Sequence, residues 1–218
     1  MPLISVVIIC FDRDKYIIDA INSVIDNKDK DTEIILSTHL INDTIIKIAQ
    51  ENSIKIIYFP EISYFNELIV EGIKNSKGDI ISFLDDDDMF LSGKIKHIKE
   101  IFSDKEVGFY HNSSEYSLEK EEYFGSSFIA IKRNIINIDK LISAGALNDT
   151  VLYLCAEESG MKMVSDKEIL TYYRIHGNNM SIDNLEWKKL RDKVLLKLPE
   201  LFPDSKMTKI ILERDYGN

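Results

Sequence analysis

A run of four carboxylates, Asp85 to Asp88, directly follows the apolar segment 80–84. Adjacent carboxylates repel one another, and hard cations such as Mg2+ and Mn2+ prefer carboxylate oxygen as a ligand. The segment 80–84 is rich in β-branched residues and predicts a buried strand that ends at these acids. Ligands of open α/β sheets bind at this edge. The sequence therefore indicates a cation or ligand site, and the competing interpretation is a solvated acidic turn.

The elements that must position this turn alternate between apolar runs and amphipathic segments. Such alternation predicts a parallel sheet with helices packed on it. We expect strands over 3–10, 33–37, 54–59 and 80–84, and helices over 14–25, 43–52 and 64–75. Asp14 is the expected cap of the first helix.

The pattern is less regular after the acidic turn, where boundaries carry weaker signals. We expect helices over 94–102, 138–144 and 149–160, strands over 107–112 and 127–131, and extended segments over 163–164 and 169–174. Residues 115–122 are polar and predict a loop or an edge hairpin. Residues 184–198 predict an amphipathic helix that ends before Pro199, and this helix can pack on the core, form a dimer contact or lie on a membrane.

Composition narrows the function classes. The chain has 218 residues, a net charge of -10 and a pI near 5.0, which argue against nucleic-acid binding through phosphate neutralisation. Cys10 and Cys155 have neither disulfide nor zinc spacing, so we expect a reducing, cytoplasmic setting. No apolar run reaches the ~20 residues that a bilayer-spanning helix needs. Peripheral membrane contact stays compatible with the sequence.

Several stretches together carry a resemblance to a known family. The segments 5–13, 33–35 and 77–88 resemble, in order and spacing, the nucleotide-sugar half of inverting family-2 glycosyltransferases. The segments 148–150 and 170–176 resemble the acceptor-side motifs of the same family. The resemblance implies a Rossmann-like GT-A fold of the α/β class, with a mostly parallel central sheet flanked by helices and a small C-terminal helical segment. It also implies a nucleoside-diphosphate sugar donor and Mn2+ or Mg2+.

The same resemblance divides the chain and leaves the acceptor open. It implies a single catalytic domain over 1–182, with a nucleotide-sugar half over 1–104 and an acceptor half over 105–182, followed by a C-terminal helix and tail over 183–218. The acceptor is a saccharide, a lipid-linked group or a protein. A homodimer is compatible with the C-terminal helix.

Roles for the acids follow from the family pattern. Asp85 is expected to face the ribose or base of the donor, and Asp87 to be the principal metal ligand. Asp88 is expected to support the turn or reach a donor hydroxyl. Asp86 occupies the most variable position and is expected to be the most solvated of the four, although it is kept among the candidate donor contacts. Asp149 is the candidate general base that takes the proton from the acceptor hydroxyl. The competing interpretation of Asp149 is an ordinary helix N-cap.

Further donor contacts are expected after the first strand and near residue 175. The expected donor-contacting segment consists of Cys10, Phe11, Asp12 and Arg13. Phe11 is expected to stack on the base. Arg174 and His176 alternate along an extended segment, so both can reach the diphosphate, with His176 as a further metal ligand.

One departure from the family concerns the second strand. The family usually carries an Asp there that binds the nucleotide base, whereas this chain reads Ser37-Thr38-His39. Hydroxyl contacts from Ser37 or Thr38, or a donor other than the usual uridine nucleotide, are the two alternatives. Lys77, before the Gly78 that permits a tight turn, is a further candidate donor contact.

Two other classes remain as alternatives. A receiver-type signalling domain is also a parallel α/β protein with an acidic pocket, but its acids follow its first strand. A catalytically silent module that binds a nucleotide sugar or a metal is the second alternative.

Overall fold

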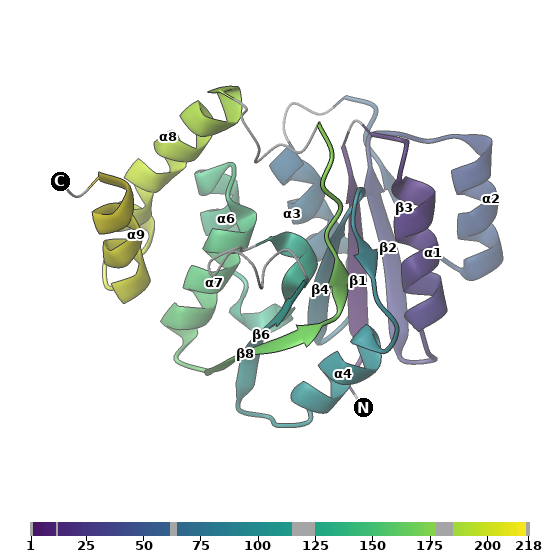
Figure 1. Cartoon of the computed structure of the whole chain (residues 1–218), viewed down its shortest axis with the longest axis horizontal. Helices are drawn as coiled ribbons and strands as arrows, with labels where there is room; N and C mark the ends of the chain where they lie inside the picture. The colour runs from purple at the N-terminus through teal and green to yellow at the C-terminus, as the bar shows by residue number, and fades with distance from the viewer. Residues whose placement is uncertain (1, 12, 62–64, 115–124, 178–184, 217–218) are drawn as a thin grey trace.

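The computed structural model describes the chain except for residues 1, 12, 62–64, 115–124, 178–184 and 217–218. A seven-stranded sheet runs through the molecule (Figure 1). Its strands lie in the order β3 (Lys55–Tyr58), β2 (Thr32–Thr38), β1 (Ile4–Cys10), β4 (Ile80–Asp85), β7 (Ile129–Lys132), β6 (Val107–Ser113) and β8 (Lys162–Ile169). The chain is therefore an α/β protein with a mostly parallel central sheet, as predicted.

The centre of the sheet is formed by the two most apolar runs of the sequence. Every residue of β1 is buried, which is why its sequence is a nearly continuous apolar run, interrupted by Ser5, and not an alternating one. β1 pairs in parallel with β2 on one side and with β4 on the other. Because these strands run upward in Figure 1, their carboxyl ends share the upper edge of the sheet.

Helices cover both faces of the sheet and bury one hydrophobic cluster on each. One face carries α1 (Ile17–Asn27), α2 (Asp43–Asn52) and α4 (Lys94–Ile101). The other face carries α3 (Phe65–Asn75), α6 (Ile138–Ala144) and α7 (Asn148–Ser159). Alternate β1 side chains serve the two clusters, with Val7 and Ile9 on the α3 side and Val6 and Ile8 on the α1 side.

The second half of the sheet departs from the predicted parallel pattern. β7 is antiparallel to both of its neighbours, β4 and β6, whereas β6 and β8 are parallel. β8 spans 162–169, not only 163–164, because most of its side chains are exposed at the sheet edge and carry no apolar signal. A small antiparallel ribbon of β5 (Met89–Phe90) and β9 (Thr171–Tyr172) was also not predicted. The expected loop or hairpin at 115–122 lies outside the described residues.

Two predicted helix starts are wrong. α1 begins at Ile17, after an N-cap Tyr16 that makes no side-chain cap bond, so Asp14 does not cap it. α7 begins at Asn148, and its N-cap Leu147 has a left-handed backbone with φ of 54°. Asp149 is therefore not the cap of that helix.

The C-terminal segment contains two helices where one was predicted. α8 (Leu185–Leu201) continues through Pro199, which lies within its last turn, and α9 (Lys206–Tyr216) follows. One face of α8 is buried in the same hydrophobic cluster as α6 and α7, through Val194, Leu195 and Leu198. This face therefore packs on the core. Among the residues described, no helix is long and apolar enough to cross a membrane.

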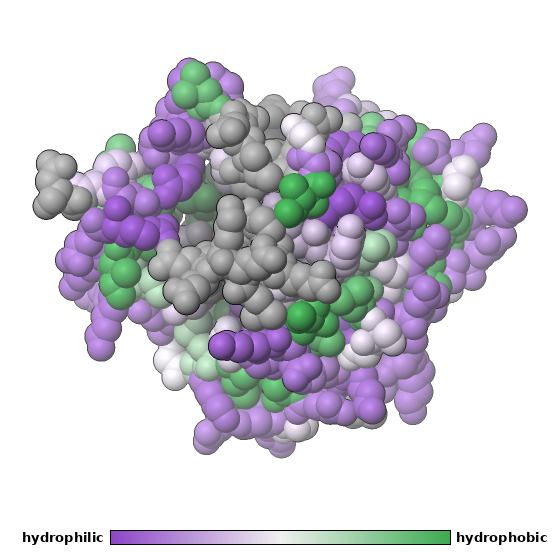
Figure 2. All heavy atoms as spheres, viewed as in Figure 1, coloured by the Kyte–Doolittle hydropathy of each residue, from purple (hydrophilic) through white to green (hydrophobic). Residues whose placement is uncertain are grey.

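Exposed apolar side chains of these helices are scattered among polar ones. Leu185, Leu196 and Ile210 are exposed on α8 and α9. Figure 2 shows a largely hydrophilic face on which hydrophobic residues form small, separated groups. Peripheral membrane contact and a homodimer through α8 stay predictions.

The turn before β4 gives a test of the fold. A Cβ on Gly78 would lie 2.5 Å from the Ser5 backbone nitrogen and 2.7 Å from Ser5 Oγ. We expect Gly78→Ala to lower the free energy of unfolding by about 1–3 kcal/mol, because β1 and β4 would have to separate. Urea unfolding measures this change. Gly177→Ala is the control, since its Cβ meets no atom within 4 Å, and equal losses in the two variants would contradict the prediction.

Candidate active site

The acidic turn lies at the carboxyl end of β4, next to β1. In the sheet, β1 lies between β2 and β4. The Asp88 amide donates to the Asp85 carbonyl at 3.2 Å and closes the turn. Asp86 and Asp87 are only 2% and 6% exposed, and Asp88 is equally buried. The interpretation of a solvated acidic turn is therefore wrong, and these carboxylates need partners within the protein.

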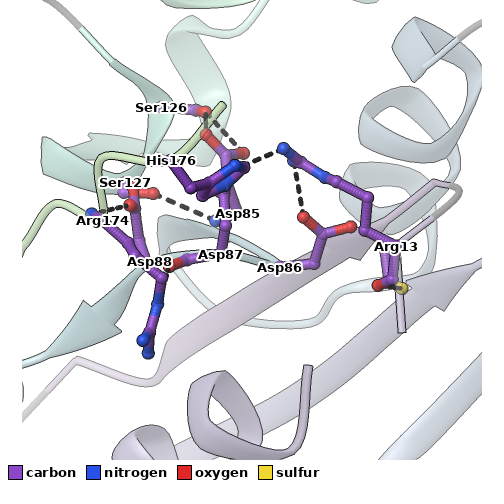
Figure 3. A network of polar contacts seen from close by, with 10 residues as sticks. Arg13, Asp85, Asp86, Asp87, Asp88, Ser126, Ser127, Arg174 and His176 are labelled. Carbon is purple, nitrogen blue, oxygen red and sulfur yellow. Dashed lines mark hydrogen bonds and ion pairs between the residues drawn. The ribbon is translucent and has the colours of Figure 1, made fainter. Parts of the chain in front are cut away.

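Arg13 is the first of these partners. Its guanidinium bridges two acids, with NH2 2.6 Å from Asp86 Oδ1 and NH1 2.6 Å from Asp87 Oδ2 (Figure 3). Burial raises the pKa of Asp86 to about 7, although the Arg13 charge acts in the opposite direction. Asp86 was expected to be solvated, and the structure corrects this because its carboxylate is enclosed with Arg13.

Asp87 and His176 converge, as the family pattern implied. His176 Nε2 lies 3.0 Å from Asp87 Oδ2, the same oxygen that Arg13 contacts. In Figure 3, His176 and the Arg13 guanidinium both approach this carboxylate. Carboxylate oxygen and imidazole nitrogen are ligands that Mn2+ accepts, so the pair forms a candidate half of a cation site.

Asp85 is fixed from the loop before β7. A short 3-10 helix, η1 (Ser126–Phe128), places Ser126 Oγ 2.8 Å and 2.7 Å from the two Asp85 carboxylate oxygens. Ser127 Oγ accepts from the Asp85 amide at 3.0 Å. Burial, followed by the neighbouring charge of Asp87, raises the pKa of Asp85 to about 7. A cation nearby would favour the ionised form of such a carboxylate.

Asp88 and Arg174 tie the segment after β9 to the turn. The Arg174 amide donates to Asp88 Oδ1 at 3.1 Å, and its Nε donates to the Asp87 carbonyl at 3.0 Å. The guanidinium then reaches Asp19 on α1, and in Figure 3 it points away from the cluster of carboxylates. Asp88 supports the turn, which is one of its two expected roles. In this arrangement the Arg174 side chain binds the Asp87 backbone carbonyl. Its contact with a diphosphate stays a prediction.

Lys94 lies behind the acidic turn and was not predicted. Its ammonium is fully buried and donates to the Ser127 carbonyl at 2.5 Å and to Thr171 Oγ1 at 2.6 Å. The ammonium also lies 4.1 Å from the centre of the Phe90 ring. Burial lowers its pKa well below the usual value, while Asp88 acts in the opposite direction. Lys94 thus joins α4 to η1 and β9, which carry or precede residues of the site.

Asp149 lies in the first turn of α7 and faces the same region. Its Oδ1 accepts from the Thr150 amide at 2.7 Å. Burial raises the pKa of Asp149 to about 6, and its charge is close enough to Asp85 to raise the pKa of that residue. A carboxylate with this pKa is ionised at pH 7 and is a stronger base than an ordinary Asp.

Two predicted donor contacts lie elsewhere. Ser37 is buried and donates to the Leu68 carbonyl at 2.7 Å, so its hydroxyl serves the core. Lys77 lies at the amino end of β4, whereas Asp85 lies at the carboxyl end of the same strand, so Lys77 is at the opposite edge of the sheet.

The segment after β1 is only partly described. Cys10 is buried, and its thiol donates to the Arg13 carbonyl at 3.4 Å. The thiol therefore supports the backbone that follows β1. Burial raises the pKa of this thiol to about 12. Phe11 is half-buried beside His39, while Asp12 lies outside the described residues. Both cysteines of the chain are free.

A divalent cation fits this site only together with further ligands. Within the described ranges, no group of three or more His, Cys, Asp and Glu side chains could hold a metal ion. Mg2+ is commonly bound by one or two protein carboxylates and completed by substrate phosphates and water. Asp87 and His176, which contact each other through Asp87 Oδ2, would supply such a small number of protein ligands. The residues therefore fit a cation that binds with a diphosphate and not alone.

The residues that were missed share a physical reason. The contacts that matter are made by Ser126, Ser127 and Lys94 with segments distant in the sequence. Local sequence patterns do not predict such contacts. A signal for Lys94 did exist. It shares the buried helix face of Ile95 and Ile98, where a lysine must be paired.

The fold and the site together define an α/β protein with its ligand site at the carboxyl ends of parallel strands, beside an acidic turn. A model of the family described as Glycosyl transferase family 2 matches residues 5–170. The chain therefore belongs to this family. The membership confirms the resemblance and excludes a receiver-type signalling domain.

Individual relatives are more distant. The chain is 29% identical over 134 residues to the GalNAc(5)-diNAcBac-PP-undecaprenol beta-1,3-glucosyltransferase of Campylobacter jejuni, a match that covers 59% of this chain and 42% of the relative. The chain thus spans less than half the length of that protein.

Solved structures of low identity share the fold. S. aureus TarS 1-349 in complex with UDP-GlcNAc has a TM-score of 0.72 at 14% identity, covering 97% of this chain and 70% of that one. The mannosyltransferase PcManGT of Pyrobaculum calidifontis, in complex with GDP-Man and Mn2+, has a TM-score of 0.66 at 9% identity, covering 98% and 76%. The GT-A fold is thereby confirmed.

Arg13 gives a test of the charge balance. We expect Arg13→Gln to bind Mn2+ without nucleotide at least about tenfold more tightly than the unmodified chain, because a guanidinium no longer opposes the cation at Asp87. Isothermal titration at pH 7.5 measures this affinity. Arg191→Gln is the matched control, since it removes a 2.6 Å Arg–Asp pair far from the site. Equal Mn2+ affinities of the two variants would contradict the expectation.

Lys94 gives a test of the support behind the turn. We expect Lys94→Met to lower the free energy of unfolding by about 1–3 kcal/mol, because the buried Ser127 carbonyl and Thr171 Oγ1 each lose a charged donor. Denaturant unfolding measures this loss. The control is Lys96→Met on the same helix, whose side chain is 83% exposed. A Lys94→Met protein as stable as this control would show that Lys94 is dispensable.

Proposed function

We propose that the chain transfers a sugar from a nucleoside-diphosphate sugar to an acceptor hydroxyl with inversion at the anomeric carbon. The observation that carries this proposal is the convergence of Asp87 and His176 at 3.0 Å, on the acidic turn and near the Asp85–Asp149 pair. Membership of the family and the shared GT-A fold support it. The complexes of distant structural neighbours with UDP-GlcNAc and with GDP-Man and Mn2+ are consistent with the donor class.

The donor side uses the acidic turn. Asp87 and His176 would hold Mn2+ or Mg2+, which when bound stabilises the negative charge of the leaving diphosphate. Asp85, held by Ser126, would face the ribose or base of the donor. Arg13 supplies a positive charge next to these groups and is available to the diphosphate once its contacts with the acids are exchanged.

The acceptor side uses Asp149. In an inverting transfer, a base on the far side of the sugar takes the proton from the attacking hydroxyl as the bond to the anomeric carbon forms. The raised pKa of Asp149 suits this task, because the ionised form persists at pH 7 and still holds a proton well. The Thr150 amide donates to Oδ1 and orients the carboxylate, which leaves Oδ2 for the acceptor.

The acceptor itself is not identified by the described residues. A saccharide, a lipid-linked group and a protein remain the candidate classes, and the negative net charge argues against a nucleic acid. The Campylobacter jejuni relative is named for an undecaprenol-linked substrate. The proposed division into a donor half over 1–104 and an acceptor half over 105–182 is consistent with these roles. The predicted cytoplasmic setting stays a prediction.

Binding and turnover of donors test the proposal. We expect a nucleoside diphosphate with Mn2+ to raise the melting temperature, and the matching sugar nucleotide to be slowly hydrolysed without acceptor. Asp87→Asn should remove the part of the shift that depends on Mn2+. A chain that binds nucleotide and Mn2+ but never turns over a donor would instead be the catalytically silent module. Absence of any nucleotide binding would refute both functions.

The pH dependence tests Asp149. We expect kcat to fall as the pH drops through about 6, because protonation of Asp149 removes the base while higher pH leaves it ionised. Asp149→Asn should lower kcat by a factor of about 10²–10⁴ and abolish this acid limb. Initial rates between pH 5 and 8 measure both effects. An unchanged rate in Asp149→Asn, with donor binding intact, would assign the base to another residue.

A further inference from the structure

The ring of Tyr16 joins the start of α1 to the segment that follows β9. Tyr16 lies three residues after Arg13 and directly precedes α1. Its ring centre is 5.3 Å from that of His176, and the two planes are inclined by 37°. The Cζ atom of Arg174 lies 4.3 Å from the same ring centre. One half-buried aromatic ring therefore contacts two residues of the segment 173–177, which we call the site strap.

The site strap is not fixed by the core of the protein. All five of its residues are described, and none belongs to a helix or a strand, because β9 ends at Tyr172. Ile175, the apolar residue between Arg174 and His176, is 56% exposed, so burial does not hold it in place. The position of the site strap therefore depends on contacts made by individual side chains.

Arg174 forms the first of these contacts. Its guanidinium, which points away from the acids in Figure 3, lies against the Tyr16 ring and reaches Asp19 at 3.1 Å, one turn further along α1. The Tyr172 ring also contacts this guanidinium, at 5.5 Å. Of these two tyrosines, Tyr16 is the one whose ring also contacts the His176 ring in the described part of the chain.

The orientation of the His176 ring decides whether it can bind a cation. An imidazole binds a metal ion through a nitrogen lone pair, which lies in the plane of the ring. His176 Nε2 faces Asp87 Oδ2 at 3.0 Å, so this nitrogen is directed at the carboxylate with which it would share a cation. Rotation of the ring about its bond to Cβ would turn Nε2 away. The contact with the Tyr16 ring opposes this rotation, because the packed pair of rings would be lost.

We propose that Tyr16 is a positioning residue, whose ring holds the site strap over the acidic turn and keeps His176 Nε2 directed at the cation site. The inference rests on the proposed function and goes beyond it by assigning a residue that acts through His176. Groups that orient a metal ligand typically contribute about 10–100-fold to metal affinity. Tyr16 acts by packing and not by a hydrogen bond, so we place its effect at the lower end of this range.

Mn2+-dependent nucleotide binding tests the inference. The probe is UDP, GDP or dTDP, whichever binds the unmodified chain most tightly, in isothermal titrations at pH 7.5 with and without Mn2+. We expect Tyr16→Leu to reduce the gain in affinity that Mn2+ gives by about five- to tenfold, because leucine has no flat ring to pack on His176. Tyr16→Phe keeps the ring, so its gain should stay within about twofold of that of the unmodified chain.

Two further variants separate positioning from a general loss of structure. Tyr172→Leu removes the other ring on Arg174 but leaves the Tyr16–His176 contact, so it should keep the Mn2+ gain within about twofold. In a chain that carries His176→Ala, adding Tyr16→Leu should cause no further loss, because its effect passes through His176. Equal losses in Tyr16→Leu and Tyr172→Leu, or a further loss in the His176→Ala background, would overturn the inference.

The chain without metal and nucleotide gives an independent readout. The ring current of Tyr16 should shift the NMR signals of the His176 ring, and this shift should disappear in Tyr16→Leu and persist in Tyr16→Phe. Identical His176 signals in the unmodified chain and both variants overturn the inference while the proposed function stands. An unmodified chain that binds none of these nucleotides, or binds them equally with and without Mn2+, overturns the proposed metal-dependent function as well.

Discussion

Four consecutive carboxylates can occupy a buried turn only if nearby groups offset their mutual repulsion. Around Asp85–Asp88 this is achieved by the Arg13 guanidinium, by hydroxyl and amide donors from η1 and the segment after β9, and by Lys94 behind the turn. These donors come from segments that meet only in the folded chain. The geometry of the site is therefore a consequence of how the second half of the sheet packs against the first.

The first half of the fold could be predicted because its central strands, β1 and β4, are buried on both faces. A nearly continuous apolar run such as β1 has few alternatives to a central parallel strand. The second half carried less information for definite reasons. The direction of β7 is decided by its pairing with β4 and β6, which leaves no local trace. β8 lies at an edge with exposed side chains, and the two-residue strands β5 and β9 are too short to show any period.

The site could be predicted where a family motif implied that residues distant in the sequence lie close together. Asp87 and His176 are 89 residues apart, and the family resemblance, not spacing, brought them together. Asp86 was misjudged because exposure was inferred from variability, whereas its partner Arg13 lies 73 residues away. Ser37 and Lys77 were misjudged for a simpler reason. One faces the core, and the other is at the wrong end of its strand, which follows from strand direction once the topology is known.

The bonds that fix the acidic turn also bear on how such chains can evolve. Asp85 depends on Ser126 and Ser127, and Lys94 depends on Thr171, so residues of the proposed donor half are completed by residues of the acceptor half. Recombination between relatives near residue 104 would separate these partners. Acceptor preference can therefore diversify by exchange of the second half only when the incoming half also carries serines in η1 and a threonine in β9. The two halves are therefore expected to be inherited together, although their proposed roles differ.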